Sequence, residues 1–105
     1  MEYKIIWSSF AVSELDNIYK YYQEKAGSKV AKSIIQNILN EPNRLIVTSE
    51  MFQTEELLIG REQIYRYIVY ENYKIIYTVD DFLKLVKISD VFDTRQNPIN
   101  IKRNK

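Results

Sequence analysis

Two tyrosines and a lysine stand close together in a stretch whose pattern is typical of a β-hairpin. Tyr65 and Tyr67 alternate along an apolar run, and Lys74 follows a two-residue polar break at 71–72. Side chains on a strand alternate between two faces, so a tight turn at that break places all three on one face. Aromatic rings beside a cation form a surface for stacking or docking. The alternative is an aromatic patch without a ligand on an open sheet face.

Two arginines lie apart from this group. Arg66 alternates to the opposite face of the same strand. Arginine is seldom buried unless it is paired, so we interpret Arg66 as half of a structural ion pair with Glu55 or Glu56. Arg95 follows the last strand-like run in a polar segment, where the pattern alone indicates a surface residue.

Composition excludes several kinds of chemistry. The 105 residues include no cysteine and no histidine, so the chain lacks a disulfide framework, a cysteine metal site and the usual general base. There is no glycine loop that could cradle a phosphate, and we predict no metal and no cofactor. No apolar run reaches membrane-spanning length and no signal sequence is evident, so we expect a cytoplasmic protein without membrane contact.

The charge is nearly balanced overall but not along the chain. The formal net charge is +1, whereas residues 64–105 hold eight Lys/Arg against five Asp/Glu, a net +3. This bias fits nucleic acid or an acidic protein as a partner, and a solvated tail is the alternative.

The hairpin belongs to a longer strand-rich region, residues 64–97. Two strands meet at a turn formed by Glu71 and Asn72, and a third strand follows a break at 80–81. The two-residue turn predicts that Tyr70 pairs with Tyr73, Ile68 with Ile75 and Arg66 with Tyr77. Asn72 tolerates the positive φ that such a turn needs.

The first forty residues predict a short strand and two helices. Residues 3–7 read as the strand, and Ser8 or Ser9 caps a helix that Gly27 ends. Ser28 caps a second helix, which ends near residue 42. The expected apolar faces are Ala11, Val12, Leu15, Ile18, Tyr19 and Tyr22 on the first helix and Val30, Ala31, Ile34, Ile35, Ile38 and Leu39 on the second.

Each helix has one apolar face that needs cover, and so does the sheet. We therefore predict an α+β fold in which a helical hairpin packs on one face of a small, mostly antiparallel sheet, in the order β-αα-βββ. Residues 43–61 are the least regular segment. One domain spans residues 1–98, and residues 99–105 form a basic tail.

The chain resembles the RelE/ParE superfamily of toxins from type II toxin–antitoxin modules. The resemblance runs through residues 3–98 and agrees with the predicted fold. The matching positions are Ser8, Ser9, Ala11, Glu14, Leu15, Ile18 and Tyr21, then Pro42, Glu55, Glu56 and Leu57, then Tyr65–Val69, Tyr73–Tyr77 and Val79, and finally Val91, Phe92, Asp93 and Arg95.

The superfamily divides by mechanism, and the resemblance implies two targets. RelE-like members cut mRNA on the ribosome, whereas ParE-like members poison DNA gyrase by binding. The long first helix and its stretch Glu14–Tyr19 look more ParE-like. RelE-like enzymes carry sheet lysines where this chain has Tyr65 and Tyr67, several relatives carry histidine where it has Asp93, and the C-terminal tyrosine is missing because none follows Tyr77.

We favour a ParE-like toxin that inhibits gyrase through Tyr65, Tyr67, Lys74 and Arg95. The second hypothesis is an mRNA endoribonuclease in which Lys74 and Arg95 stabilise the phosphate and Tyr65, Tyr67 or Asp93 transfers protons. The third is an inactive member that only binds its antitoxin. All three hypotheses imply an antitoxin as partner. The toxin is expected to form either a homodimer or a heterotetramer with that antitoxin.

Overall fold

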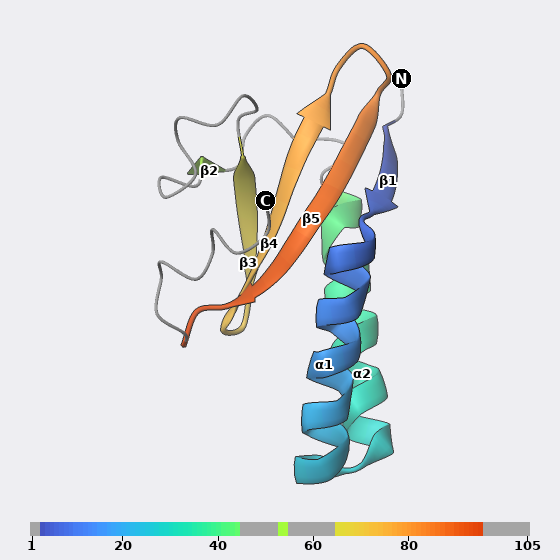
Figure 1. The fold of residues 1–105 in the computed structure, drawn as a ribbon, viewed down its shortest axis with the longest axis vertical. Helices are drawn as coiled ribbons and strands as arrows, with labels where there is room; N and C mark the ends of the chain where they lie inside the picture. Colours follow the sequence, from blue (N-terminus) through green and yellow to red (C-terminus); the bar gives the residue numbers. More distant parts are fainter. Residues whose placement is uncertain (1–2, 45–52, 55–64, 96–105) are drawn as a thin grey trace.

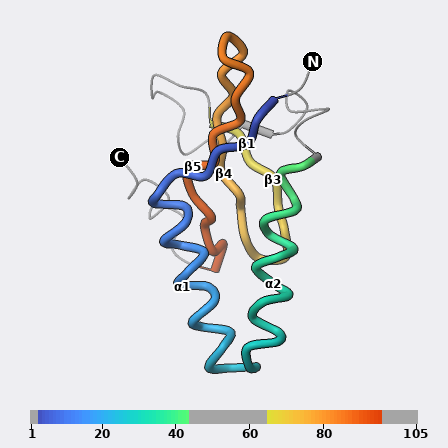
Figure 2. Tube along the Cα trace, turned by 90° about the vertical axis from the view of Figure 1, so that its right-hand side faces the viewer, coloured from blue at the N-terminus to red at the C-terminus, as the bar shows by residue number. Residues whose placement is uncertain are grey.

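The computed structural model describes residues 3–44, 53–54 and 65–95 of the chain. A five-stranded sheet has the order β1-β5-β4-β3-β2, and two helices lie side by side against one of its faces (Figures 1 and 2). The elements are β1 (Lys4–Trp7), α1 (Ser9–Ala26), α2 (Ser28–Asn40), the 3-10 helix η1 (Glu41–Arg44), β2 (Gln53–Thr54), β3 (Arg66–Tyr70), β4 (Tyr73–Asp80) and β5 (Leu85–Asp93). The predicted α+β architecture is confirmed, and the two-residue β2 is an addition to it.

The predicted register of the β3–β4 hairpin is confirmed. Tyr70 pairs with Tyr73, and the pairing continues in step along both strands to Arg66 and Tyr77. The positive φ of the turn falls on Glu71, at 54°, rather than on Asn72. The side chain of Asn72 instead donates a hydrogen bond to the carboxylate of Asp93, at 3.0 Å.

Strand β5 connects the three C-terminal strands to β1, the first strand of the chain. It pairs antiparallel with β4 and parallel with β1, which is therefore an edge strand. A register shift lies between Ile76 and Tyr77, where β5 carries the extra residue Ser89. The backbone carbonyl of Ser89 accepts a hydrogen bond from the Ser8 hydroxyl, which fixes the start of α1 against the sheet.

The helix boundaries follow the predicted capping residues with one correction. The hydroxyl of Ser8 accepts a hydrogen bond from the amide of Ala11, at 3.0 Å, and so caps α1. Gly27, with φ of 93°, joins the two helices, as a residue without a side chain can. Ser28 does not cap α2: it is the first helical residue, and Gly27 occupies the cap position. The two helices run antiparallel and extend beyond the end of the sheet (Figure 2).

The apolar face of each helix is narrower than its pattern predicts. Val12 is 51% exposed, and Val30 and Leu39 are also exposed. The start of α1 lies so close to β5 that the small Ala11 faces the sheet. A neighbouring residue points about 100° further round the helix, so Val12 is turned outward.

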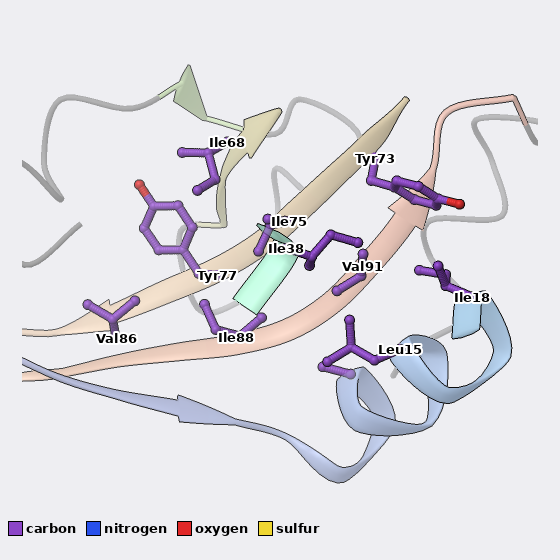
Figure 3. Packing of buried hydrophobic residues seen from close by; sticks show 11 residues of the cluster. Leu15, Ile18, Ile38, Ile68, Tyr73, Ile75, Tyr77, Val86, Ile88 and Val91 are labelled. Carbon is purple, nitrogen blue, oxygen red and sulfur yellow. The ribbon is translucent and has the colours of Figure 1, made fainter. Parts of the chain in front are cut away.

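The main core lies between the helices and the sheet. Leu15 and Ile18 of α1 and Ile38 of α2 face the strand residues of β4 and β5 (Figure 3). This is the face predicted for helix cover. The sheet residues buried in it are Ile68, Tyr73, Ile75, Tyr77, Val86, Ile88 and Val91.

The opposite face of the sheet, called here the second face, is not open as expected. Ile76 and Phe92 are buried there in a smaller cluster, against which Tyr65 and Tyr67 pack. Thr78 and Asp90 are also buried. The two tyrosines are thus half-buried parts of a cluster, and not rings lying on bare sheet.

Candidate functional site

Lys74 and Tyr67 are brought together on the second face, as predicted. Tyr67 pairs with Ile76 and Lys74 with Val69, so the two side chains are diagonal neighbours across β3 and β4. The Nζ atom of Lys74 lies 4.5 Å from the centroid of the Tyr67 ring. This cation–π contact holds the lysine at a fixed place beside two half-buried tyrosines.

Arg66 lies apart from that group, in agreement with its predicted alternation. It pairs with Tyr77, is half-buried, and belongs to the face that the helices cover. The predicted partners Glu55 and Glu56 lie outside the described residues, so the ion pair stays a prediction.

Arg95 and Asp93 form a tight pair at the end of β5. The amide and the Nε of Arg95 donate to Oδ1 of Asp93 at 2.9 and 3.0 Å, and Nη2 donates to Oδ2 at 2.8 Å. The guanidinium carbon also lies 5.9 Å from the centroid of the Tyr21 ring on α1. The side chain of Arg95 is therefore directed to the helix side of the sheet, although 55% of it is exposed.

This pair borders a cleft of about 190 Å³ between α1 and β5. Its apolar floor includes Ile18 and Val91, and its rim is polar. The lining residues are Glu14, Asn17, Ile18, Tyr21, Tyr73, Val91, Asp93 and Arg95. A hollow with an apolar floor and a few polar groups is the usual form of a ligand site.

The charge states in the cleft follow from these contacts. Hydrogen bonds from the Arg95 side chain lower the pKa of Asp93, with further help from the Arg95 amide and Asn72 and against the effect of burial. The same carboxylate raises the pKa of Arg95. Burial, followed by a hydrogen bond with Tyr22, raises the pKa of Tyr73. At neutral pH the cleft thus holds a neutral phenol and a mutually neutralised ion pair.

The sequence prediction missed the cleft as a site, although one signal was present. Glu14, Asn17, Ile18 and Tyr21 are spaced i, i+3, i+4 and i+7, which places them on one face of a helix. What the pattern does not reveal is that this face meets Tyr73 and Asp93, which are paired across β4 and β5.

The two predicted cations are therefore on opposite faces of the sheet. Lys74 contacts Tyr67 on the second face, whereas Arg95 contacts Tyr21 of α1 on the helix side. The two side chains thus have their aromatic contacts on different sides of the sheet.

Metal and membrane features were also sought in the part of the chain that the structure describes. It contains no group of three or more carboxylates placed to hold a metal ion. Neither described helix combines the length and the apolarity needed to cross a bilayer.

Comparison with known proteins agrees with the fold. A family model described as the ParE toxin of the type II toxin–antitoxin system, parDE, matches residues 5–98. Among solved structures, a chain of the "Chromosomal ParDE TA system from P. aeruginosa" is similar, with a TM-score of 0.71 and 18% identity over 87% of this chain and 95% of that chain. At that identity the likeness shows the fold alone. No curated protein matched the chain.

Fold and family model together define an α+β toxin of the RelE/ParE superfamily, as the resemblance predicted. More narrowly, the chain belongs to the ParE toxin family. It is the toxin of a type II toxin–antitoxin system, and its partner is an antitoxin.

Proposed function

We propose that this toxin arrests growth by binding DNA gyrase through the second face of its sheet, with Tyr65, Tyr67 and Lys74 as contacts. The observation that carries the proposal is the placement of Lys74 and Arg95 on opposite faces. That arrangement suits a binding surface and disfavours a phosphate-cleaving centre.

Cleavage of RNA at a 2′-hydroxyl needs a base, an acid and cations that meet at one phosphate. Arg95 is held by the carboxylate of Asp93 and would have to exchange that partner for the phosphate. Tyr73, the phenol of the same cleft, has a raised pKa, so it does not supply a phenolate base at neutral pH. These features weigh against the endoribonuclease alternative and leave binding as the better-supported mode.

The second face has the properties of a contact surface. The two tyrosines pack against a buried cluster and the lysine lies over a ring, so all three are already partly ordered before binding. Val69, the strand neighbour of Lys74, is 54% exposed and adds apolar area beside it. Arg95 faces the cleft, so we assign it a structural role and leave it out of the gyrase contact.

The antitoxin is proposed to occupy a different region, the helical hairpin and a sheet edge. Val12 of α1 and Val30 and Leu39 of α2 are exposed apolar side chains on that hairpin. Strand β1 is an edge of the sheet and can accept an added strand. Val30→Asp changes an exposed side chain and should abolish antitoxin capture, whereas charge reversal at Lys74 or Arg95 should leave capture intact.

The decisive experiment is inducible expression in bacteria without the antitoxin, followed within minutes by two readouts. One maps mRNA ends at ribosomes and the other maps chromosomal DNA breaks. The proposal expects DNA breaks with intact messages. Codon-phased cleavage with undamaged DNA would overturn it and favour the endoribonuclease, and no effect on growth would indicate an inactive member.

Assembly and location form the remaining part of the proposal. We propose a cytoplasmic toxin, held as a homodimer or in a heterotetramer with its antitoxin. Light scattering on the purified toxin and on the complex distinguishes these states, and a monomer bound to one antitoxin would contradict both.

A further inference from the structure

The turn between β4 and β5 ends in two exposed apolar side chains. Phe82 is 92% exposed and Leu83 is 57% exposed. A phenyl ring in that position gains almost nothing from the fold of its own chain. The turn projects from the end of the sheet opposite to the one where the helices turn, and both views show it there (Figures 1 and 2).

The turn is held in place by its neighbours. Oδ1 of Asp80 accepts a hydrogen bond from the amide of Leu83, at 2.9 Å, and the hydroxyl of Tyr3 donates to Asp81. The amide of Lys4 donates to the carbonyl of Lys84, at 2.9 Å. These bonds fix the backbone on both sides of Phe82, so binding through this residue would need little further ordering.

The charged groups around the turn are satisfied within the chain. Nζ of Lys87 lies 3.9 Å from Asp80, and Nζ of Lys84 lies 5.4 Å from the centroid of the Tyr3 ring. The turn therefore presents apolar side chains without an unbalanced charge, which fits an apolar pocket in a protein. A lipid surface fits less well, because Asp80 and Asp81 would be carried toward it.

The turn directly follows β4, the strand that carries Lys74 of the second face. Lys74 and Phe82 are eight residues apart, a span of about 26 Å along an extended strand. A standard protein interface covers about 800 Å² on each partner and is thus about 28 Å across. One partner on the second face can therefore reach the turn as well.

We propose that Phe82 and Leu83 form an anchor that enters an apolar pocket of the folded protein that this toxin attacks. The anchor rests on the proposed function, because it extends the target surface. Its backbone is bonded to the start of β1, but the side chain of Phe82 is exposed at the turn and lies away from the helical hairpin assigned to the antitoxin. Phe82 is the principal contact, since it is the more exposed of the two and aromatic residues are enriched at the cores of protein interfaces.

The test compares Phe82→Ser with wild type and with Phe82→Trp. Growth arrest on expression, inhibition of purified DNA gyrase and affinity for the antitoxin are measured for each. Phe82→Ser should lose toxicity and gyrase inhibition by about 30-fold or more, because truncated aromatic anchors have effects of that size. Phe82→Trp should retain both activities, and antitoxin affinity should not change in either variant.

Phe82→Ser should leave the stability of the fold unchanged, because Phe82 is almost fully exposed. Val12→Ser changes an exposed side chain on α1, outside the proposed target surface, and should keep full toxicity. It is a control for toxicity and gyrase inhibition only, because Val12 belongs to the surface assigned to the antitoxin. Full toxicity of Phe82→Ser would overturn the anchor. So would a parallel loss of antitoxin affinity, a change in oligomeric state, or wild-type binding to vesicles of phosphatidylglycerol and phosphatidylethanolamine that depends on Phe82.

The two proposals fail in different ways. Wild type that arrests growth without inhibiting gyrase contradicts the gyrase target, and the anchor is then decided by growth arrest alone. If wild type inhibits gyrase and Phe82→Ser inhibits it equally strongly, only the anchor is contradicted. A wild-type chain that arrests nothing contradicts both.

Discussion

On the helix-covered face of the sheet, Ile75 is buried beneath two helices, whereas on the second face Ile76 is buried beneath tyrosine side chains. The cations differ in the same way. Arg95 is locked to Asp93 on the helix side, and Lys74 rests on Tyr67 on the other. The comparison teaches that the cation on the helix side is paired with a carboxylate, while the cation on the second face, which we propose as a target contact, lies over an aromatic ring.

The largest expected effect concerns the two isoleucines. Ile75→Ala should lower the free energy of unfolding by about 4 kcal/mol and Ile76→Ala by about 2 kcal/mol, both within the range of about 2 to 5 kcal/mol for such truncations. Helices cannot easily close a cavity, whereas Tyr65 and Tyr67 can rotate toward one. Urea denaturation of both variants measures the difference, and equal losses would mean that the second face is as rigid as the first.

The two cations should differ in their effect on toxicity. Lys74→Ala should weaken target binding by about tenfold, as expected for a contributing contact at an interface. Arg95→Ala should change it by less than about twofold, because that side chain points to the cleft. Dose–response curves for growth arrest measure both, and equal losses would instead favour a shared nuclease site.

The Asp93–Arg95 pair should contribute a pH-dependent stability. Because the pKa of Asp93 in the folded chain lies below its ordinary value of 3.8, its contribution is complete above that value and is lost as pH falls through the folded pKa. Asp93→Asn should therefore lower stability by about 1 kcal/mol at pH 7, in the range of partly exposed ion pairs. The difference in unfolding free energy between Asp93→Asn and wild type should shrink below pH 3.8, as urea denaturation at several pH values would measure. A difference that persists in acid would show that the effect comes from packing and not from the ion pair.

The smallest expected effect is that of the contact between Lys74 and Tyr67 on folding. Lys74→Met keeps a long side chain over the ring and removes the charge, so it should lower the unfolding free energy by about 0.5 kcal/mol. Thermal denaturation at low and high salt measures it. A loss of several kcal/mol would show that Lys74 is a structural residue, and the proposed contact surface would then need another cation.

Local patterns predicted much of this fold. The turn at 71–72 predicted the register of β3 and β4, because side-chain alternation and a two-residue loop leave one pairing. Ser8 and Gly27 predicted the limits of α1, because capping depends on residue type and local backbone. Val12 shows where the pattern fails. Periodicity predicts the apolar side of a helix to within about one residue, but the position of the helix relative to the sheet decides whether Ala11 or Val12 is covered.

By itself, then, the sequence determined the elements, their order, the hairpin register and the second-face group of Tyr65, Tyr67 and Lys74. Those features depend on neighbours in the chain or across one tight turn. Only the tertiary structure decided that Arg95 turns to α1, that Tyr21 and Asp93 border one cleft, and that Phe82 stays uncovered. The first two features depend on where α1 meets the end of β5, some seventy residues away, and the third depends on what the rest of the chain leaves uncovered. Local sequence patterns specify neither.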